Sequence, residues 1–289
     1  MSHYLEQTRR ESRGQYKYRV DCDKIQNDPT TLTVLNGNVR DKHTMVINAV
    51  VKEFHNKQNQ IVVKIGKTNE LVRQEYNVAK KLNDAGMHGF IRMDCVFSCK
   101  HSLEKYNAGQ QIDDSFQVCE LSGKDEVDVI IMPFIGKGIT LNHYLESGGD
   151  AEHYKKILKQ VVENLFNAFV KTGFVHSDLH FGNILIDDDG KPIIMDFDTS
   201  AFVSQSASQW RFWADLHRII GMVIEKGYPS NPKSYAVSNA LSISIMINTL
   251  LYASTTDDVF ARHVQNIVNL IDVSSVNIID ASKTSKIRL

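Results

Sequence analysis

The sequence lacks the features that mark membrane and secreted proteins. No apolar run approaches the roughly 18 residues needed to cross a bilayer. The opening stretch MSHYLEQTRRESRGQYKYRV has no apolar core of the kind found in secretory signals. We therefore expect no membrane span and a location in the cytosol.

Cysteine is also scarce. The four cysteines are too few for a disulfide scaffold in a chain of 289 residues, so we expect free, mostly buried thiols. A zinc site is disfavoured because Cys95, Cys99 and His101 are loosely spaced and no second pair of ligands follows.

Neither sign of charge is in excess. The 33 basic and 34 acidic residues give a net charge of −1, so nothing favours a nucleic acid or a membrane surface as a partner. The hydrophobic content of 42% is ordinary for a globular protein, and the length allows one large domain or two small lobes. Residues 1–30 begin with a polar, Arg-rich stretch that we interpret as an N-terminal extension.

Residues 31–132 read mainly as sheet, because β-branched runs are separated by polar stretches. We expect a turn at Asn36-Gly37-Asn38 and a polar turn at 55–59. The pattern changes to a helical period at 71–83. Strands are expected at 31–35, 45–54, 61–65, 91–98, 116–121 and 127–132.

The rest of the chain reads mainly as helix. A long amphipathic helix is expected to begin at Asp150 and to stop at Lys171-Thr172-Gly173, where a basic side chain and a glycine suit a helix end. Further helices are expected at 212–227, 238–253 and 257–271.

The most informative stretch is GFVHSDLHFGNILIDDDGKPIIMDFDTSA, residues 173–201. Asp178 stands five residues before Asn183 and eighteen before Asp196. An acid, an amide and a second acid at these offsets suit a metal-assisted phosphoryl transfer, in which one carboxylate aligns a hydroxyl and the others hold Mg²⁺ on ATP.

This His-x-Asp-x-x-x-x-Asn and Asp-Phe pattern resembles the catalytic and metal-binding loops of the protein-kinase-like superfamily. The resemblance implies an α+β, two-lobe fold with a lobe at 31–132, a hinge near 133–136 and a helical lobe at 133–289. It makes Asp178 the catalytic base or hydroxyl aligner, and Asn183 and Asp196 the Mg²⁺ ligands. It gives structural roles to His176, to Phe197 packing against the main helix of the first lobe, and to Asp215 bracing the catalytic loop.

Two residues upstream complete the phosphate site implied by the resemblance. Lys64 ends the run Ile61-Val62-Val63-Lys64, which is similar to the third-strand lysine motif of the family. Glu75 is the best candidate for its ion-pair partner, because it stands beside the inward face of the helix at 71–83; Glu70 is the alternative.

The resemblance also implies an adenine site in which Met132 is the gatekeeper and Pro133 offers its carbonyl to the base. Ile135 would supply an N–H. The apolar residues of this pocket would be Val62, Leu185 and Met195, which are equally consistent with ordinary core.

Four departures from the family pattern point to an atypical, compact kinase. Only Gly37 stands where a glycine-rich loop, here 36–42, would cover the phosphates, and His180, a further candidate catalytic residue, replaces the usual lysine. Asp198 replaces the glycine of the metal motif. Nineteen residues separate Asp196 from Asp215, with no Ala-Pro-Glu motif. Compact kinases of large DNA viruses and bacterial effectors share this look, and for a viral chain the location becomes the host cytosol or the virion.

Three functions remain open. The leading hypothesis is an ATP- and Mg²⁺-dependent serine/threonine-protein kinase. The Asp-Leu-His-x-Gly-Asn loop and the short segment after Asp196 also fit a small-molecule kinase of the aminoglycoside or choline phosphotransferase type. A pseudokinase scaffold is supported only by the glycine-poor loop. The sequence indicates no oligomeric state.

Overall fold

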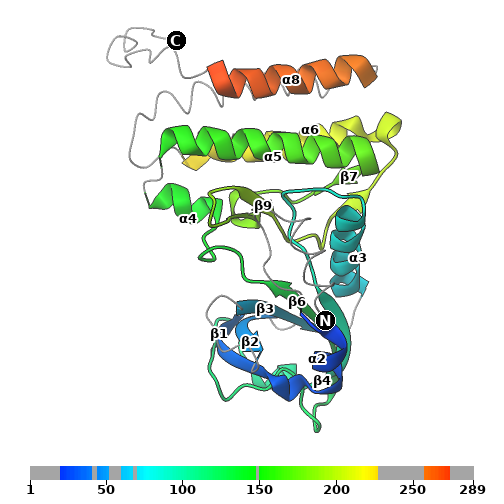
Figure 1. Ribbon diagram of the computed structural model, residues 1–289, viewed down its shortest axis with the longest axis vertical. Coiled ribbons are helices and arrows are strands. Elements are labelled where there is room, and N and C mark those ends of the chain that lie inside the picture. The colour runs from blue at the N-terminus through cyan, green and yellow to red at the C-terminus, as the bar shows by residue number, and fades with distance from the viewer. Residues whose placement is uncertain are drawn as a thin grey trace, which may run out of the picture. The chain divides into compact units, whose positions relative to one another are not determined.

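The computed structural model describes residues 20–40, 44–51, 60–67, 70–147, 150–226 and 257–273. This part of the chain has an α+β fold with an antiparallel sheet and several helices (Figure 1). The expected polar turn at 55–59 and helix at 238–253 lie outside the described residues, as do residues 1–19 of the expected extension.

The chain divides into two compact units. The first contains the residues up to Lys81 together with Ile91–Lys137, and the second contains Leu82–Phe90 and the residues from Gly138 onward. Each unit has its own sheet or sheets and its own buried apolar residues.

A six-stranded antiparallel sheet forms most of the first unit, in the order β4-β6-β3-β2-β1-β5. In β3, Ile61, Val63 and Ile65 are buried while the alternate residues are half-buried, as the two-residue period of a strand dictates. The strands are β1 (Leu32–Val39), β2 (Thr44–Val51), β3 (Gln60–Lys67), β4 (Cys95–His101), β5 (Gln111–Ile112) and β6 (Asp125–Pro133).

The expected turn at 36–38 is wrong, because β1 continues through it. Gly37 pairs with Ile47 of β2 and with Ile112 of β5, after a register shift between Val34 and Asn36. A Cβ on Gly37 would lie 2.8 Å from the carbonyl oxygen of Val46. The glycine therefore serves the close approach of a neighbouring strand rather than a turn.

The expectation of free thiols is also wrong. Cys22 is bonded to Cys95 and Cys99 to Cys119. The first bond ties the short helix α2 (Cys22–Asn27) to β4, and the second ties β4 to the segment expected to be a strand at 116–121, which is irregular instead. The pairing depends on which segments meet in space, and the spacing of the cysteines along the chain does not reveal that.

Helix α3 (Glu70–Asp84) follows β3 in sequence and is amphipathic. Its buried residues recur at helical spacing: Val72, Glu75, Val78, Ala79 and Leu82. One charged residue, Glu75, thus lies on the apolar face of the helix.

Helices dominate the second unit: α4 (Leu141–Glu146), α5 (Ala151–Thr172), α6 (Gln205–Lys226) and α8 (Asp257–Val273). Helix α5 has the expected ends, with the Asp150 side chain accepting from His153 N at 2.7 Å and Gly173 in the left-handed region at φ 75°. Figure 1 shows α8 running alongside α5, and rings of the three long helices pack at centroid distances of 5.2–6.3 Å. These rings belong to Phe166, Phe169, Phe212, Trp213 and Phe260.

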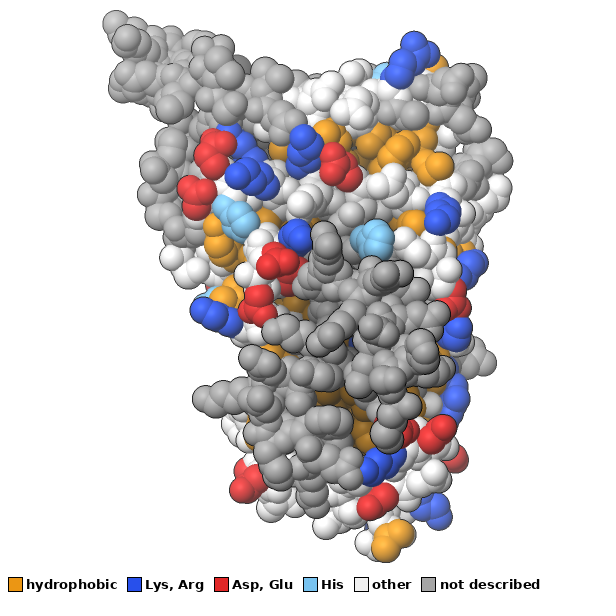
Figure 2. Space-filling model, viewed as in Figure 1, with side chains coloured by type: hydrophobic (Ala, Val, Ile, Leu, Met, Phe, Trp, Pro, Cys, Tyr) orange, Lys and Arg blue, Asp and Glu red, His pale blue; other side chains and the backbone are white. Residues whose placement is uncertain are grey.

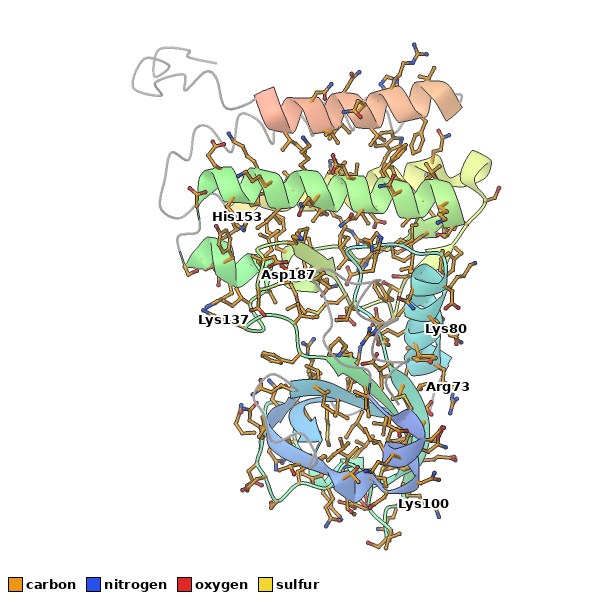
Figure 3. All side chains as sticks on the ribbon, viewed as in Figure 1. Arg73, Lys80, Lys100, Lys137, His153 and Asp187 are labelled. Carbon is orange, nitrogen blue, oxygen red and sulfur yellow. A yellow bond between two sulfur atoms is a disulfide. The ribbon has the colours of Figure 1, made fainter. Side chains whose placement is uncertain are left out.

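Two small antiparallel sheets frame the informative stretch of sequence. Strand β7 (Phe174–Val175) pairs with β10 (Ala201–Phe202), and β8 (Ile184–Ile186) pairs with β9 (Pro192–Ile194). The turn between β8 and β9 is closed by the side chain of Asp187 (Figure 3), which accepts hydrogen bonds from the backbone N–H groups of Asp189 and Lys191. The segment between β7 and β8 is thereby fixed at both ends.

The surface seen in Figure 2 carries Lys and Arg side chains interspersed with Asp and Glu side chains, without a large patch of one sign among the coloured residues. None of the helices in the described part of the chain combines the length and apolar character needed to span a bilayer.

Candidate functional site

Lys64 and Glu75 form an ion pair within the first unit. The Lys64 Nζ atom lies 2.6 Å from Glu75 Oε2, and the two side chains are 16% and 3% exposed. Lys64 sits on β3, while Glu75 comes from the apolar face of α3. The structure therefore brings together the two residues that the sequence paired. The Lys64 side chain stays partly exposed, whereas that of Glu75 is buried.

A second ion pair attaches α3 to the sheet, and sequence reasoning missed it. Arg73 Nη2 lies 2.8 Å from Asp128 Oδ1, and Ser98 Oγ donates to the same oxygen at 2.7 Å. Asp128 is fully buried in β6, whereas Arg73 is about half exposed (Figure 3). Because Arg73 stands two residues before Glu75, this contact fixes the part of α3 that presents Glu75 to Lys64. The signal in the sequence was a lone carboxylate inside the apolar run 127–132.

The proposed adenine-site residues of the first unit lie where β6 ends. Met132 pairs with Val62 of β3 and Pro133 with Ile61. Phe134 N then donates to Gln60 O at 3.1 Å, and Ile135 is buried. Val62 and Lys64 are two residues apart in β3, so their side chains leave the same face of the sheet.

In the second unit, the loop after β7 is held by a buried carboxylate. Asp215 Oδ2 accepts from His176 N at 2.7 Å, and Asp215 Oδ1 accepts from Ser177 N at 2.9 Å. Burial raises the pKa of Asp215 to about 6, although the two N–H groups act in the opposite direction. The loop turns sharply here, since Ser177 adopts φ 68°, a conformation that non-glycine residues rarely take.

His176 and Phe197 are buried beneath this loop. The Nε2 atom of His176 lies 2.9 Å from the carbonyl oxygen of Met195, so it carries the ring proton. Burial lowers the pKa of His176, which keeps the ring neutral. The Phe197 ring contacts Phe174, Phe90 and His176 at centroid distances of 5.9, 6.3 and 5.8 Å. His176 thus links the loop to the segment that leads into Asp196.

Two donors flank the half-exposed carboxylate of Asp178. Arg218 Nη1, on α6, lies 2.9 Å from Asp178 Oδ1 and also donates to the Ser177 carbonyl. His180 Nε2 lies 4.0 Å from Asp178 Oδ2, while His180 Nδ1 accepts from Gly182 N at 3.0 Å. Sequence reasoning missed Arg218, although it stands three residues after Asp215 and so on the same face of α6.

Asn183 is buried at the end of the loop and is oriented by its neighbours. Its Nδ2 donates to the Asp178 carbonyl at 3.1 Å, and its backbone carbonyl accepts from Met195 N at 2.9 Å. Met195 is followed by Asp196, which adopts φ 67°. Leu185, two residues after Asn183, is half-buried in β8 and pairs with Ile193.

The donor set of this loop fits Mg²⁺. Because the amide nitrogen of Asn183 is used by the Asp178 carbonyl, the amide oxygen is the atom left for a cation. An amide oxygen and the Asp196 carboxylate are hard ligands, to which ATP and water oxygens would be added. In the described part of the chain no three His, Cys, Asp or Glu side chains gather as a metal cluster.

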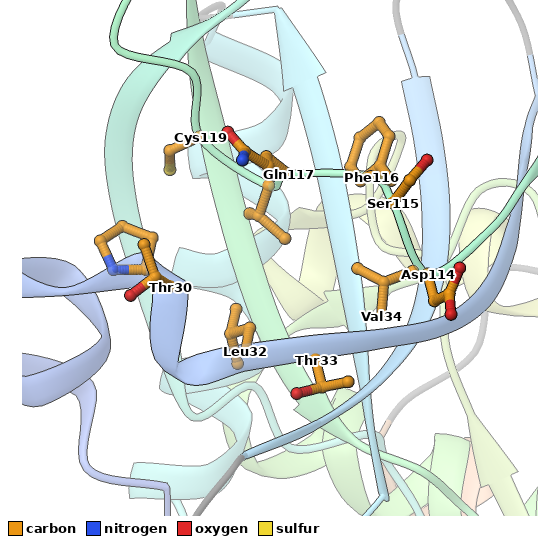
Figure 4. Close-up of a pocket in the computed structure, with 11 residues that line it drawn as sticks. Thr30, Leu32, Thr33, Val34, Asp114, Ser115, Phe116, Gln117 and Cys119 are labelled. Atoms are coloured by element: carbon orange, nitrogen blue, oxygen red, sulfur yellow. The ribbon is translucent and has the colours of Figure 1, made fainter.

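A pocket of about 230 Å³ in the first unit lies elsewhere (Figure 4). It is formed by the start of β1 and the irregular segment 114–119, and none of the predicted nucleotide residues lines it. Gly37 also lies apart from any turn, and residues 41 and 42 of the expected phosphate-covering loop are outside the described residues, so that role stays a prediction.

Comparison with known families matches part of the chain. Residues 118–219 match the model of the ABC1 atypical kinase-like domain. This range contains β6, the loop at 176–183, Asp196 and Asp215, and it supports a kinase-like function. A search of curated proteins found no match to the chain.

Proposed function

We propose that this chain is an ATP-dependent kinase that transfers the γ-phosphate to a hydroxyl group. The observation that carries the proposal is the braced loop at 176–183, in which Asp215 holds the backbone, Asp178 presents a carboxylate and Asn183 an amide oxygen. The match of residues 118–219 to an atypical kinase-like domain supports it.

In this proposal the candidate residues have separate roles. Lys64, held by Glu75, binds ATP phosphates as a compact positive charge. Asn183 and Asp196 would hold Mg²⁺, which would supply neutralisation of the phosphate charge. Asp178 orients the acceptor hydroxyl, so the rate enhancement comes mainly from positioning and charge neutralisation.

A protein serine or threonine is the first acceptor class to test, because the sequence favoured it. A specific observation favours a small molecule as the second class. Only residues 197–204 separate the proposed metal ligand Asp196 from α6, and they contain a turn and β10. A segment this short leaves little chain for the platform on which protein kinases bind peptides.

Nucleotide binding and phosphoryl transfer separate the roles of the two aspartates. Asp196→Asn is expected to abolish Mg²⁺-dependent ATP binding measured by calorimetry, because a metal ligand is lost. Asp178→Asn is expected to bind Mg-ATP like the wild type and to abolish transfer. Equal affinity in the wild type and Asp196→Asn would refute the metal assignment. Normal ATP binding without transfer to any acceptor would favour a pseudokinase.

The cytosolic location stays a prediction, and the two disulfides weigh against it, since disulfides are rare in the reducing cytosol. Alkylating free thiols in intact cells before lysis tests it. Alkylation of all four cysteines would support the cytosol, whereas alkylation of no cysteine would support an oxidising compartment.

A further inference from the structure

We propose that Arg218 is a positioning residue that fixes the carboxylate of Asp178 for the acceptor hydroxyl; this inference rests on the proposed kinase function. Arg218 donates from one nitrogen to both the Ser177 carbonyl and Asp178 Oδ1. No role was predicted for Arg218 from the sequence.

The contacts of α6 form a clamp on the backbone of one residue of the loop, Ser177. Asp215 accepts from the N–H of Ser177, and Arg218, three residues later on the helix, donates to the carbonyl of the same residue. Ser177 is held at φ 68° between these two contacts. A left-handed conformation at a serine persists only where its surroundings enforce it, and Asp215 and Arg218 supply that enforcement from opposite sides.

Arg218 also contacts the side chain of Asp178, the residue proposed to orient the acceptor hydroxyl. The Asp178 side chain is 52% exposed, so without a partner it would exchange among rotamers in solvent. Arg218 occupies Oδ1 at 2.9 Å, and Oδ2 faces His180 Nε2 at 4.0 Å. Because Oδ1 is already engaged by Arg218, Oδ2, on the side of His180, is the oxygen better placed to receive an acceptor hydroxyl. Arg218 sets which oxygen faces the substrate, and a displacement of this group by about 1 Å can lower a rate by about 100-fold.

The chain offers a matched control for this role. Arg211 lies on the same helix and is exposed, and its guanidinium stacks on the ring of Trp210 at 5.3 Å rather than on the loop. Replacing it removes the same charge from α6 without touching Ser177 or Asp178. Because Arg218 is itself 51% exposed, Arg218→Ala opens no cavity in the core.

The test compares wild type, Arg218→Ala, Arg218→Lys and Arg211→Ala by phosphoryl transfer and Mg-ATP binding. Arg218→Ala is expected to lower kcat about 10- to 100-fold while the ATP affinity stays within about twofold. Arg218→Lys should recover part of the rate because it keeps the charge but not the fork. An unchanged kcat in Arg218→Ala, or a fall in kcat as large in Arg211→Ala as in Arg218→Ala, would overturn the inference.

Hydrogen exchange separates this inference from the proposed function. In Arg218→Ala, amides of peptides covering 174–183 are expected to exchange about tenfold faster, as on losing one hydrogen bond to a charged group. Arg211→Ala should exchange like the wild type. Absence of transfer in wild type would refute the proposed function, whereas unchanged exchange in Arg218→Ala would refute the clamp whether or not the wild type is active.

Discussion

Removing Arg73 is predicted to loosen α3 and thereby weaken nucleotide binding. Loss of one partner from a buried ion pair costs about 3–5 kcal/mol. Arg73 is 49% exposed and Ser98 still donates to Asp128, so we expect Arg73→Ala to lower the local stability of α3 by about 2 kcal/mol. The remaining cost reflects the Asp128 carboxylate, which stays fully buried without its cation.

The assay must report on the first unit. Both tryptophans, Trp210 and Trp213, lie in α6 of the second unit, so intrinsic fluorescence does not follow α3. Hydrogen exchange of peptides from 70–84 does, and about 2 kcal/mol corresponds to roughly 30-fold faster exchange. Mg-ATP binding, measured in parallel, should weaken because Glu75 no longer holds Lys64 in one position.

Two variants sharpen this prediction. Arg73→Ala with Asp128→Asn should recover at least half of the lost protection, because a buried amide costs less than a lone carboxylate. Asn77→Ala, at an exposed position of the same helix, should behave like the wild type. If Arg73→Ala left both exchange and ATP binding unchanged, the tether would have no role in placing Glu75.

Three further outcomes are expected. Lys64→Ala should weaken Mg-ATP binding by about tenfold or more. Lys67→Ala should not, because the ion pair of Lys67 with Asp125 is half exposed. Equal Mg-ATP affinities in the wild type and Lys64→Ala would exclude Lys64 from the site. The pKa of Asp215 is raised from 3.8 to about 6, so between these pH values the folded state binds a proton that the unfolded state has lost. The free energy of unfolding should therefore fall as pH rises from about 4 to 6, by up to about 3 kcal/mol. Urea unfolding followed by tryptophan emission, which reports on α6, checks this, and the same pH slope in Asp215→Asn would contradict it. Reducing the disulfides Cys22–Cys95 and Cys99–Cys119, which close loops of 73 and 20 residues, should destabilise the first unit by at most about 4 and 3 kcal/mol respectively. Unchanged hydrogen exchange of the β4 amides after reduction would argue against either bond.

Features that depend on neighbouring residues were predictable from the sequence. Helix α5 has its expected limits because Asp150 caps its first turn and Gly173 ends it, and both effects act within a few residues. The spacing of Asp178, Asn183 and Asp196 is likewise a local property of one stretch. Lys64 and Glu75 could be paired because a strand and an amphipathic helix follow each other closely, and the carboxylate stands out on the apolar face of that helix.

Features that depend on contacts between distant segments were not predictable in this way. Asn36-Gly37-Asn38 has turn composition, yet β2 and β5 pair with it and draw it into a strand. The cysteine pairs and the contact between Arg73 and Asp128 join segments that only the folded sheet brings together. Arg218 reaches a loop forty residues away in sequence, so its partner could not be read from its own helix.

The most direct test of the central claim is transfer of the γ-phosphate from ATP with Mg²⁺, comparing wild type with Asp178→Asn. The acceptors should include a generic basic protein, the chain itself and panels of aminoglycosides and amino alcohols. The proposed function predicts transfer by the wild type and none by Asp178→Asn, with equal Mg-ATP binding in both. Equal transfer by the two proteins, or no transfer by the wild type to any acceptor, would contradict it.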